Sequence, residues 1–333
     1  MKPIAILGAG SWGTALAVHM ARVGRDVHLW ARGSAIVEAM ATTKRNPRYL
    51  SDIQLPDSIA VTTSTEAALR DVDCVVIAVP THGVRTVMRT AAPLLARDAI
   101  LVSAAKGLET KSLERMSQVI AGETGGRHAI VVLSGPSFAA EVARELPTAV
   151  LAASTDGAAA QAVQEQFRGR GFRIYASDDV PGVEIGGALK NVIAIAAGCV
   201  EGLGLGHNAM AALITRGLAE ISRLACAVGG RRETLAGLSG LGDLVLTCTG
   251  DLSRNRRVGI ELGRGRPLVE ILRDIRMVAE GVRTTGAALA LGERHGIELP
   301  IAAQMAAVLE GRSSPMVAVE SLMGRRQRAE TER

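Results

Sequence analysis

Aromatic residues are scarce in this chain of 333 residues, which contains three Phe, two Tyr and two Trp. Proteins that bind single-stranded nucleic acid stack its bases on aromatic side chains, so this scarcity argues against that class of partner. The apolar fraction is nevertheless an ordinary 48%, so the cores must consist mainly of Ala, Val, Leu and Ile. A single core rarely grows beyond about 250 to 300 residues, and the length therefore predicts two domains.

Lysine is rare as well. Of the 38 basic residues only five are lysines, namely Lys2, Lys44, Lys106, Lys111 and Lys190. Arginine does not release its proton in a protein, whereas the amine of lysine can. Codon bias explains the general preference for arginine equally well. A lysine retained inside an apolar segment is still a candidate for proton transfer.

The sequence shows neither closely spaced cysteines nor a segment that resembles a signal peptide. The cysteines are far apart, without C-x-x-C spacing, which predicts reduced core residues in a reducing compartment. No cleavable signal is visible, and the apolar stretches fall short of the ~20 residues that a membrane-spanning helix needs. We therefore expect a cytoplasmic protein without stable membrane insertion. The cysteines are Cys74, Cys199, Cys226 and Cys248.

The formal charge of +5 and the pI near 9.3 are compatible with an anionic ligand. Basic residues are interspersed with acids, except for short runs at 254–257 and at the C-terminal end. This pattern argues against nucleic acid or an acidic membrane as a partner. No histidine pair has metal-ligand spacing, so no metal site is predicted.

Three glycines near the N-terminus form the clearest motif. Residues 3–30 are predicted to form strand, turn, helix and strand, with Gly8, Gly10 and Gly13 as G-x-G-x-x-G in the turn. In this context the glycines allow a tight turn, the approach of a pyrophosphate and close helix packing. The pyrophosphate would lie on the backbone N–H groups around Ser11 and Trp12. The motif predicts a dinucleotide-binding domain of the Rossmann type.

The end of the second strand bears on the choice of dinucleotide. The strand ends at Trp30-Ala31-Arg32, without the Asp or Glu that usually binds the ribose 2′-hydroxyl. Arg32 can pair with a 2′-phosphate, which favours NADP(H) while still permitting NAD(H). The alternative is an exposed surface arginine without a ligand.

Strand-like segments alternate with helical ones up to about residue 180, with a polar loop expected at 46–56. Such alternation predicts a mostly parallel sheet with helices on both faces. Three strand ends carry polar or backbone-exposing residues, at 80–82, 105–107 and 134–137, and we expect them to meet at one crevice. The strands expected after the first two are 59–62, 74–79, 100–103, 130–133, 148–152 and 173–175.

Beyond residue 180 the pattern is helical, which sets the expected domains at residues 1–180 and 181–333. The helix expected at 183–200 is apolar on nearly every face, with Lys190 and Asn191 as its strongly polar interior groups. A lysine there has to pair with a carboxylate, reach solvent, or transfer protons with a pKa lowered by burial. Because this helix joins the domains, Lys190 is expected to face the cleft between them. The other helical windows are 208–228, 231–237, 254–263, 268–273, 281–295, 301–310 and 315–323.

The helical half contains two further features. Glycine-rich segments at 202–208 and 239–243 are expected to be loops that line a small ligand. Ser253 is a natural N-cap for the helix at 254–263, with Arg254 and Asn255 in its first turn. A cation at a helix start is unfavourable unless an anion binds there, so this cluster predicts a phosphate site. A plain surface helix is the alternative.

These residues resemble, over nearly the whole chain, the bacterial-type NAD(P)-dependent glycerol-3-phosphate dehydrogenases. The resemblance implies an α/β Rossmann-type domain followed by an all-α domain like the C-terminal domain of 6-phosphogluconate dehydrogenase. It implies reduction of dihydroxyacetone phosphate to sn-glycerol 3-phosphate, the backbone precursor of phospholipids, and a homodimer is a family expectation. The matching stretches are GAGSWGTALA at 8–17, AAKGLE at 104–109, SGPSFAAEVA at 134–143, GGALKNVIAIAAG at 186–198, ALITRGLAEISRL at 212–224, GLGDLVLTCTGDLSRNRRVG at 240–259 and AEGVRTT at 279–285.

The resemblance also implies roles for single residues. Lys190 resembles the general acid and base, and Lys106 the second ammonium at the reacting centre. The sequence departs from the family pattern at Glu201, Met210 and Gly286, none of which is a site position. The implied substrate contacts are Lys106, Gly135, Ser137, Lys190, Asp243, Ser253, Arg254 and Asn255. The implied dinucleotide contacts are Gly8, Gly10, Ser11, Trp12, Gly13, Arg32, Tyr49, Lys106, Ala139, Arg254, Val278 and Glu280.

Two other functions fit parts of the pattern. A β-hydroxyacid dehydrogenase also combines a Rossmann domain, a helical domain and a lysine, but its carboxylate substrate would not need the cluster at 253–255. A nucleotide-sensing module without turnover would keep the glycine motif, but it has no need for both Lys106 and Lys190.

Overall fold

The computed structural model describes residues 2–275, 279–327 and 329. The chain divides into two compact units. The first unit comprises Met1–Lys106 and Met116–Val180, and the second comprises Gly107–Arg115 and Pro181–Arg333.

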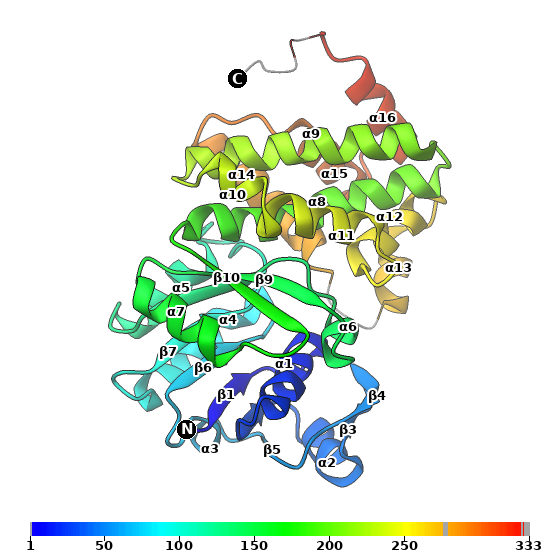
Figure 1. Cartoon of the computed structure of the whole chain (residues 1–333). Helices are drawn as coiled ribbons and strands as arrows, with labels where there is room; N and C mark the ends of the chain where they lie inside the picture. The colour runs from blue at the N-terminus through cyan, green and yellow to red at the C-terminus, as the bar shows by residue number, and fades with distance from the viewer. Residues whose placement is uncertain (1, 276–278, 328, 330–333) are drawn as a thin grey trace. The chain divides into compact units, whose positions relative to one another are not determined.

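An eight-stranded sheet forms the centre of the first unit (Figure 1). Its strand order is β10-β9-β8-β7-β6-β1-β2-β5, and all neighbours are parallel except β8 and β9. The mostly parallel sheet predicted from the alternation is confirmed. Its strands are β1 (Ile4–Leu7), β2 (Val27–Trp30), β5 (Ile59–Thr62), β6 (Cys74–Ile77), β7 (Ile100–Ser103), β8 (Ile130–Ser134), β9 (Thr148–Ala153) and β10 (Phe172–Ser177).

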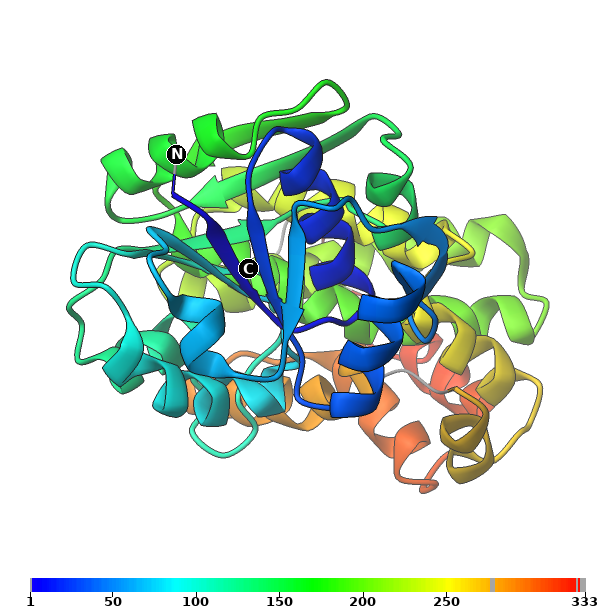
Figure 2. The same ribbon diagram turned by 90° about the horizontal axis from the view of Figure 1, so that it is seen from below.

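Helices connect these strands. They are α1 (Ser11–Arg22), α2 (Ser34–Thr43), α3 (Thr65–Leu69), α4 (Thr81–Ala91), η1 (Ala92–Leu94), α5 (Met116–Thr124), α6 (Ala139–Ala143) and α7 (Gly157–Gln166). Successive side chains of a strand point to opposite faces of the sheet. In β1, Ile4 and Ile6 belong to one core with residues of α1 and α7, whereas Ala5 and Leu7 belong to another with residues of α3, α4 and α5. Figure 2 shows α1 and the cyan helices on opposite sides of the sheet. Both faces are covered, which explains why these strands are continuous apolar runs.

Residues 46–56, predicted to be a polar loop, contain a strand. The strand β4 (Leu50–Gln54) pairs antiparallel with the short β3 (Arg45–Asn46), so the prediction of a loop is wrong. Only Asn46 and Leu50 are buried in these two strands, and no hydrophobic alternation marks them in the sequence. A buried polar residue therefore fixes the hairpin instead of an apolar stripe.

The second unit is helical, and its longest helix is α8 (Val180–Gly202). We expected no apolar stretch long enough to span a membrane, and by length and composition α8 contradicts this, because it has 23 residues. Its apolar window is entirely buried inside the protein, as in the core helix of a domain. The other helices of the unit are α9 (Gly206–Ala227), α10 (Arg232–Leu235), η2 (Leu238–Gly242), α11 (Asp243–Thr249), α12 (Arg254–Gly263), α13 (Leu268–Asp274), α14 (Glu280–Arg294), α15 (Pro300–Leu309) and α16 (Pro315–Met323).

The segment Gly107–Arg115 belongs to the second unit although it lies far from it in the sequence. Its Leu108 is buried in the same core as α8. Its Arg115 donates from Nη1 to Oε2 of Glu184 on α8 at 2.6 Å. Apolar packing against the core of the second unit and an ion pair to α8 therefore attach the segment.

The segment 239–243, predicted to be a glycine loop, is helical. Leu238–Gly242 forms a π-helical turn that continues directly into α11, so the prediction is wrong. A Cβ on Gly240 would lie 2.1 Å from the carbonyl oxygen of Leu235. Close packing on α10, and not contact with a ligand, explains the glycine at this position.

Helices α8 and α12 approach closely enough for their backbones to touch. A Cβ on Gly259 of α12 would lie 1.9 Å from the carbonyl oxygen of Ile195 on α8. A Cβ on Gly198 of α8 would lie 2.0 Å from the carbonyl oxygen of Arg256 on α12. Only glycine fits at such a crossing, which fixes the position of α12 against α8.

We expect Gly259→Ala to destabilise the protein by more than the ~1–3 kcal/mol that is typical of overpacking, because the added methyl group meets backbone that cannot rotate away. The control is Gly286→Ala on α14, where nothing lies within 4 Å of the added Cβ. This control should be stabilised by about 0.4–1 kcal/mol, since alanine loses less entropy than glycine in a helix. Thermal unfolding of both variants measures the difference, and equal melting temperatures would show that the helices can separate at no cost.

Glu220 on α9 is buried, with 4% of its surface exposed. It accepts the backbone N–H groups of Ile301 at 2.6 Å and Ala302 at 3.4 Å, in the first turn of α15. Burial raises the pKa of this carboxyl from 4.5 to about 7, although the two amide N–H groups and the charges of Arg223 and Arg325 act against the shift. The folded protein therefore binds a proton at Glu220 more tightly than the unfolded chain does.

A raised carboxyl pKa has a defined effect on stability. The contribution of Glu220 is fully present below pH 4.5 and is lost as the pH rises through about 7. A shift of this size corresponds to on the order of 3 kcal/mol. Glu220→Gln cannot ionise, so its melting temperature should fall less than that of the wild type between pH 5 and pH 8.5. Glu310→Gln, at an exposed carboxylate, is the control. A variant with the wild-type pH dependence would show that Glu220 does not titrate in this range.

Candidate active site

The glycine turn joins β1 to α1 as predicted. Gly8 has a φ of +125°, and a Cβ on it would lie 2.8 Å from the backbone of Ala78. A Cβ on Gly13 would lie 1.8 Å from the carbonyl oxygen of Gly8. By contrast, nothing lies within 4 Å of the Cβ position of Gly10, and α1 begins without a side-chain cap. The turn fits the pyrophosphate of a dinucleotide, because it places N–H groups beside open space.

Three predicted dinucleotide contacts lie near this turn or after β2. Ser11 donates from Oγ to the carbonyl oxygen of Tyr49 at 3.3 Å. Nε1 of Trp12 is buried and has no hydrogen-bond partner among the described residues. Arg32 is exposed, which suits both a contact with a ribose phosphate and a plain surface arginine.

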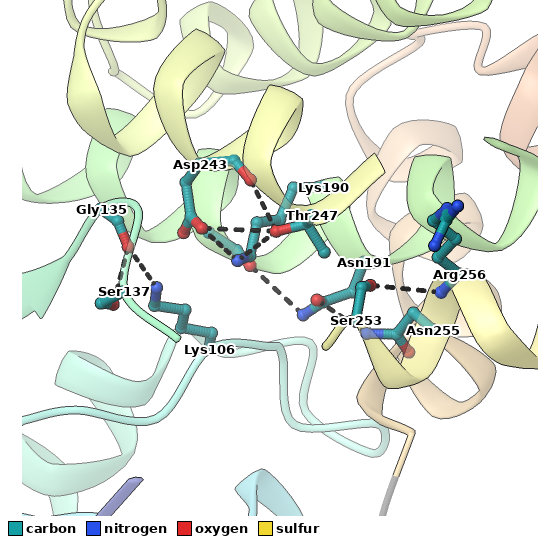
Figure 3. A network of polar contacts seen from close by, with 11 residues as sticks. Lys106, Gly135, Ser137, Lys190, Asn191, Asp243, Thr247, Ser253, Asn255 and Arg256 are labelled. Atoms are coloured by element: carbon teal, nitrogen blue, oxygen red, sulfur yellow. Dashed lines mark hydrogen bonds and ion pairs between the residues drawn. The ribbon is translucent and has the colours of Figure 1, made fainter. Parts of the chain in front are cut away.

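Lys106 and Ser137 share an acceptor at the carboxyl edge of the sheet (Figure 3). Their Nζ and Oγ atoms donate to the carbonyl oxygen of Gly135 at 2.8 and 2.9 Å. Lys106 follows β7 and Gly135 follows β8, and these strands are parallel neighbours. The prediction that these two strand ends come together is confirmed. His82, in the third predicted segment, is exposed.

Lys190 on α8 has a carboxylate partner (Figure 3). Its Nζ donates to Oδ1 of Asp243 and, at 2.8 Å, to Oγ1 of Thr247. The Thr247 hydroxyl in turn donates to the carbonyl oxygen of Asp243 at 2.6 Å. Lys190 is 7% exposed and Asp243 is 1% exposed. Of the three possibilities for this lysine, pairing with a carboxylate is the one observed, and it favours the charged ammonium form.

The neighbouring Asn191 links α8 to α12 and, through it, to α14. Nδ2 of Asn255 donates to Oδ1 of Asn191 at 2.9 Å. The backbone N–H of Gly281 donates to Oδ1 of Asn255 at 3.0 Å. Both asparagines are buried. Two side-chain amides therefore hold the starts of α12 and α14 on the residue next to Lys190.

Ser253 caps α12 as predicted, since its Oγ accepts the backbone N–H of Arg256 at 3.2 Å. Arg254 is the first residue of the helix and is half-buried. The side chain of Arg256 pairs with Glu201 at 2.6 Å and with Asp251 at 2.9 Å. The departure from the family pattern at Glu201 is thus accommodated by an ion pair.

The remaining predicted contacts lie at helix starts or outside the described residues. Ala139 begins α6 and Glu280 begins α14. Val278 lies outside the described residues. Within residues 2–275, 279–327 and 329, no group of three or more His, Cys, Asp or Glu side chains could hold a metal ion.

Three of the four cysteines are buried. Desolvation by burial raises the pKa of each of these thiols to about 12. They stay protonated near neutral pH and are poor nucleophiles. They are Cys74, Cys199 and Cys248.

Comparison with known proteins decides the family. Residues 3–160 match the model of the NAD-dependent glycerol-3-phosphate dehydrogenase N-terminus, and residues 179–320 match that of its C-terminus. The chain belongs to the NAD-dependent glycerol-3-phosphate dehydrogenase family. It is 50% identical to glycerol-3-phosphate dehydrogenase (NAD(P)+) of Koribacter versatilis and 51% identical to that of Thioalkalivibrio sulfidiphilus, over 98% of each chain.

A solved member of this family has the same fold. The crystal structure of glycerol-3-phosphate dehydrogenase from Coxiella burnetii superposes with a TM-score of 0.94 at 43% sequence identity. The match covers 97% of this chain and 99% of that one. The α/β domain followed by an all-α domain, as expected from the resemblance, is confirmed.

Sequence reasoning did not assign a role to Thr247. It lies four residues after Asp243, and this spacing places both side chains on one face of a helix. The expectation of a loop at 239–243 hid that signal. The sequence pattern indicates that Asn191 is a polar residue in an apolar helix, but it predicts no role for it, because its partner Asn255 lies 64 positions away.

We expect Arg254→Ala to raise KM for a phosphorylated substrate. The substitution removes a charge-assisted contact to phosphate at the helix start, which costs about 2–4 kcal/mol of binding free energy. Arg257→Ala removes an exposed charge from the same helix and is the matched control. Steady-state kinetics measure both. A KM within twofold of the wild type for Arg254→Ala, with only the melting temperature lowered, would place the phosphate elsewhere.

Proposed function

We propose that this protein catalyses the reversible, NAD(P)H-dependent reduction of dihydroxyacetone phosphate to sn-glycerol 3-phosphate, which supplies the backbone of phospholipids. The arrangement on α8 supports the proposal most directly. A buried ammonium, that of Lys190, is paired with Asp243, and the next residue, Asn191, is bonded to the first turn of α12. In this proposal α8 therefore carries the proton donor, Lys190, and is hydrogen-bonded through Asn191 to the start of α12, which binds the phosphate.

In this proposal the glycine turn of the first unit binds the pyrophosphate of the dinucleotide, and the start of α12 in the second unit binds the phosphate of the substrate. The glycine turn takes the pyrophosphate on the N–H groups of Ser11 and Trp12. Arg32 pairs with a 2′-phosphate, so NADP(H) is preferred and NAD(H) is accepted. When bound, the dinucleotide supplies the hydride for the carbonyl carbon. The proposed contacts outside the turn are Tyr49, Lys106, Ala139, Arg254, Val278 and Glu280.

Lys190 donates a proton to the substrate oxygen that gains negative charge as the carbonyl is reduced. Asp243 keeps its ammonium charged before the reaction, and Thr247 fixes the direction of Nζ. In the oxidative direction the neutral amine takes the proton back. Lys106 supplies a second positive charge at the reacting centre, with Gly135 and Ser137 beside it.

The phosphate lies at the start of α12, where N–H groups, the helix dipole and the guanidinium of Arg254 act together. Ser253 caps this helix. Asn255 contributes mainly its backbone N–H, since its side-chain amide is bonded to Asn191 and Gly281. From the family resemblance we further propose a cytoplasmic homodimer.

Absorbance at 340 nm tests the function directly. Purified protein mixed with NADPH and dihydroxyacetone phosphate should oxidise the cofactor and form sn-glycerol 3-phosphate in a 1:1 ratio. Unphosphorylated dihydroxyacetone should react far more slowly, and a β-hydroxyacid with NADP+ should not react. Parallel assays with NADH measure the cofactor preference. Turnover of the β-hydroxyacid alone would identify a different dehydrogenase, and binding of NADPH without any turnover would indicate a sensing module.

Lys190→Arg separates charge from proton transfer. Arginine keeps the positive charge but does not release a proton, so kcat should fall by roughly 10²- to 10⁴-fold while NADPH affinity stays unchanged. Calorimetric titration with NADPH and the melting temperature show whether the variant is folded. A kcat within fivefold of the wild type would leave Lys190 as an electrostatic anchor and assign proton transfer to another group.

A further inference from the structure

Asn46 is a fully buried polar residue in the first unit, with 0% of its surface exposed. Its Nδ2 donates to the carbonyl oxygen of Ala9 at 2.9 Å and to Oγ1 of Thr14 at 2.8 Å. Its Oδ1 accepts the backbone N–H of Tyr49 at 3.3 Å. One side chain therefore connects the glycine turn, helix α1 and the hairpin of β3 and β4.

The bond to Ala9 sets the direction of a peptide group in the glycine turn. The C=O and the N–H of a planar trans peptide point in opposite directions. Because the C=O of Ala9 points to Asn46, the N–H of Gly10 points away from it. The Cβ position of Gly10 is open, with nothing within 4 Å. Asn46 thus fixes the peptide between Ala9 and Gly10, which leads directly into the N–H groups of Ser11 and Trp12 in the proposed pyrophosphate site.

Asn46 also positions Tyr49, which lies between the two strands of the hairpin. The N–H of Tyr49 is held by Asn46, and its carbonyl oxygen accepts Oγ of Ser11 at 3.3 Å. Both backbone polar groups of Tyr49 therefore have partners, one within the hairpin at Asn46 and one at the start of α1. The guanidinium of Arg48 lies 5.3 Å from the centre of the Tyr49 ring and covers it from one side.

The chemistry of the position favours a specific role over general stability. An amide can be buried without penalty only when its donors and acceptor are satisfied, and at Asn46 both donors and the acceptor have partners. An apolar side chain could fill the same space, but it would leave the glycine turn and the hairpin unconnected. The three bonds therefore specify a relative position of two segments.

We propose that Asn46 is a positioning residue for the dinucleotide, which holds the Gly10 peptide and Tyr49 in the arrangement that binds the cofactor. This inference rests on the proposed dinucleotide binding by the first unit. Asn46 acts through these groups and does not itself touch the cofactor or the substrate.

The test is the affinity for NADPH of Asn46→Ala, measured by calorimetric titration without substrate. The dissociation constant and the KM for NADPH should rise at least tenfold. At saturating NADPH, kcat and the KM for dihydroxyacetone phosphate should stay within twofold of the wild type. Asn46→Asp, which loses both donors and brings a charge into the core, should weaken NADPH binding more.

Two further variants separate positioning from general stability. Val163→Ala, in α7 and in the same core, should lower the melting temperature without changing the affinity for NADPH. Thr14→Val keeps the volume of the side chain and removes one acceptor of Asn46, so it should weaken NADPH binding by a smaller factor. Thr14→Val also tests the proposal if Asn46→Ala does not fold.

Coupling to Tyr49 gives a readout that a structural role would not move. In a Tyr49→Ala background, Asn46→Ala should cost less affinity than in the wild type, because part of its effect passes through Tyr49. The inference is overturned if Asn46→Ala and Thr14→Val bind NADPH within twofold of the wild type. A wild-type protein that does not bind NADPH at all would instead refute the proposed function.

Discussion

The buried pair of Lys190 and Asp243 is the constraint on which the second unit depends. A charge in an apolar interior is costly, and a partner compensates for it only when the geometry and the remaining hydrogen bonds are complete. The ammonium on the mostly apolar α8 therefore requires α11 to begin at Asp243, where an acid also suits the positive end of the helix. The hydroxyl of Thr247 serves the same need, since it places a second oxygen atom beside the ammonium.

Backbone contact between α8 and α12 links this pair to the proposed phosphate site. The crossing at Gly198 and Gly259 leaves no space for a side chain, so α12 cannot slide along α8. Asn255 then bonds to Asn191, and the start of α14 bonds to Asn255. The starts of α12 and α14 are thereby held relative to Asn191, the residue next to Lys190. Catalysis that depends on the distance between a phosphate and a carbonyl needs this kind of rigidity, because small displacements of the reacting groups are costly.

The sequence predicted those elements whose order comes from apolar patterning. Strands such as β6 and β7 are continuous apolar runs because helices cover both faces of the sheet, and the helices of the second unit show regular periodicity. Prediction from the sequence was wrong where a single polar contact or a close approach of two backbones determines the local structure. The hairpin is held by Asn46, whose partners lie up to 37 positions away, and Gly240 packs on backbone. The pairing of Lys190 with Asp243 spans 53 positions, so no local spacing reveals it.

The charge state of Lys190 links structure to the direction of the proposed reaction. Reduction of a carbonyl consumes a proton, and the pair with Asp243 keeps that proton on Nζ before substrate arrives. Release of that proton, to the substrate during reduction or before oxidation of the alcohol, leaves the carboxylate of Asp243 buried without its counter-charge. In the proposed reaction the contact with Asp243 therefore keeps Nζ protonated before substrate binds, but it also raises the free energy needed to release that proton. The free energy for deprotonation has to come from groups that act when substrate is bound, and a second ammonium at the reacting centre, the role proposed for Lys106, is a group of that kind.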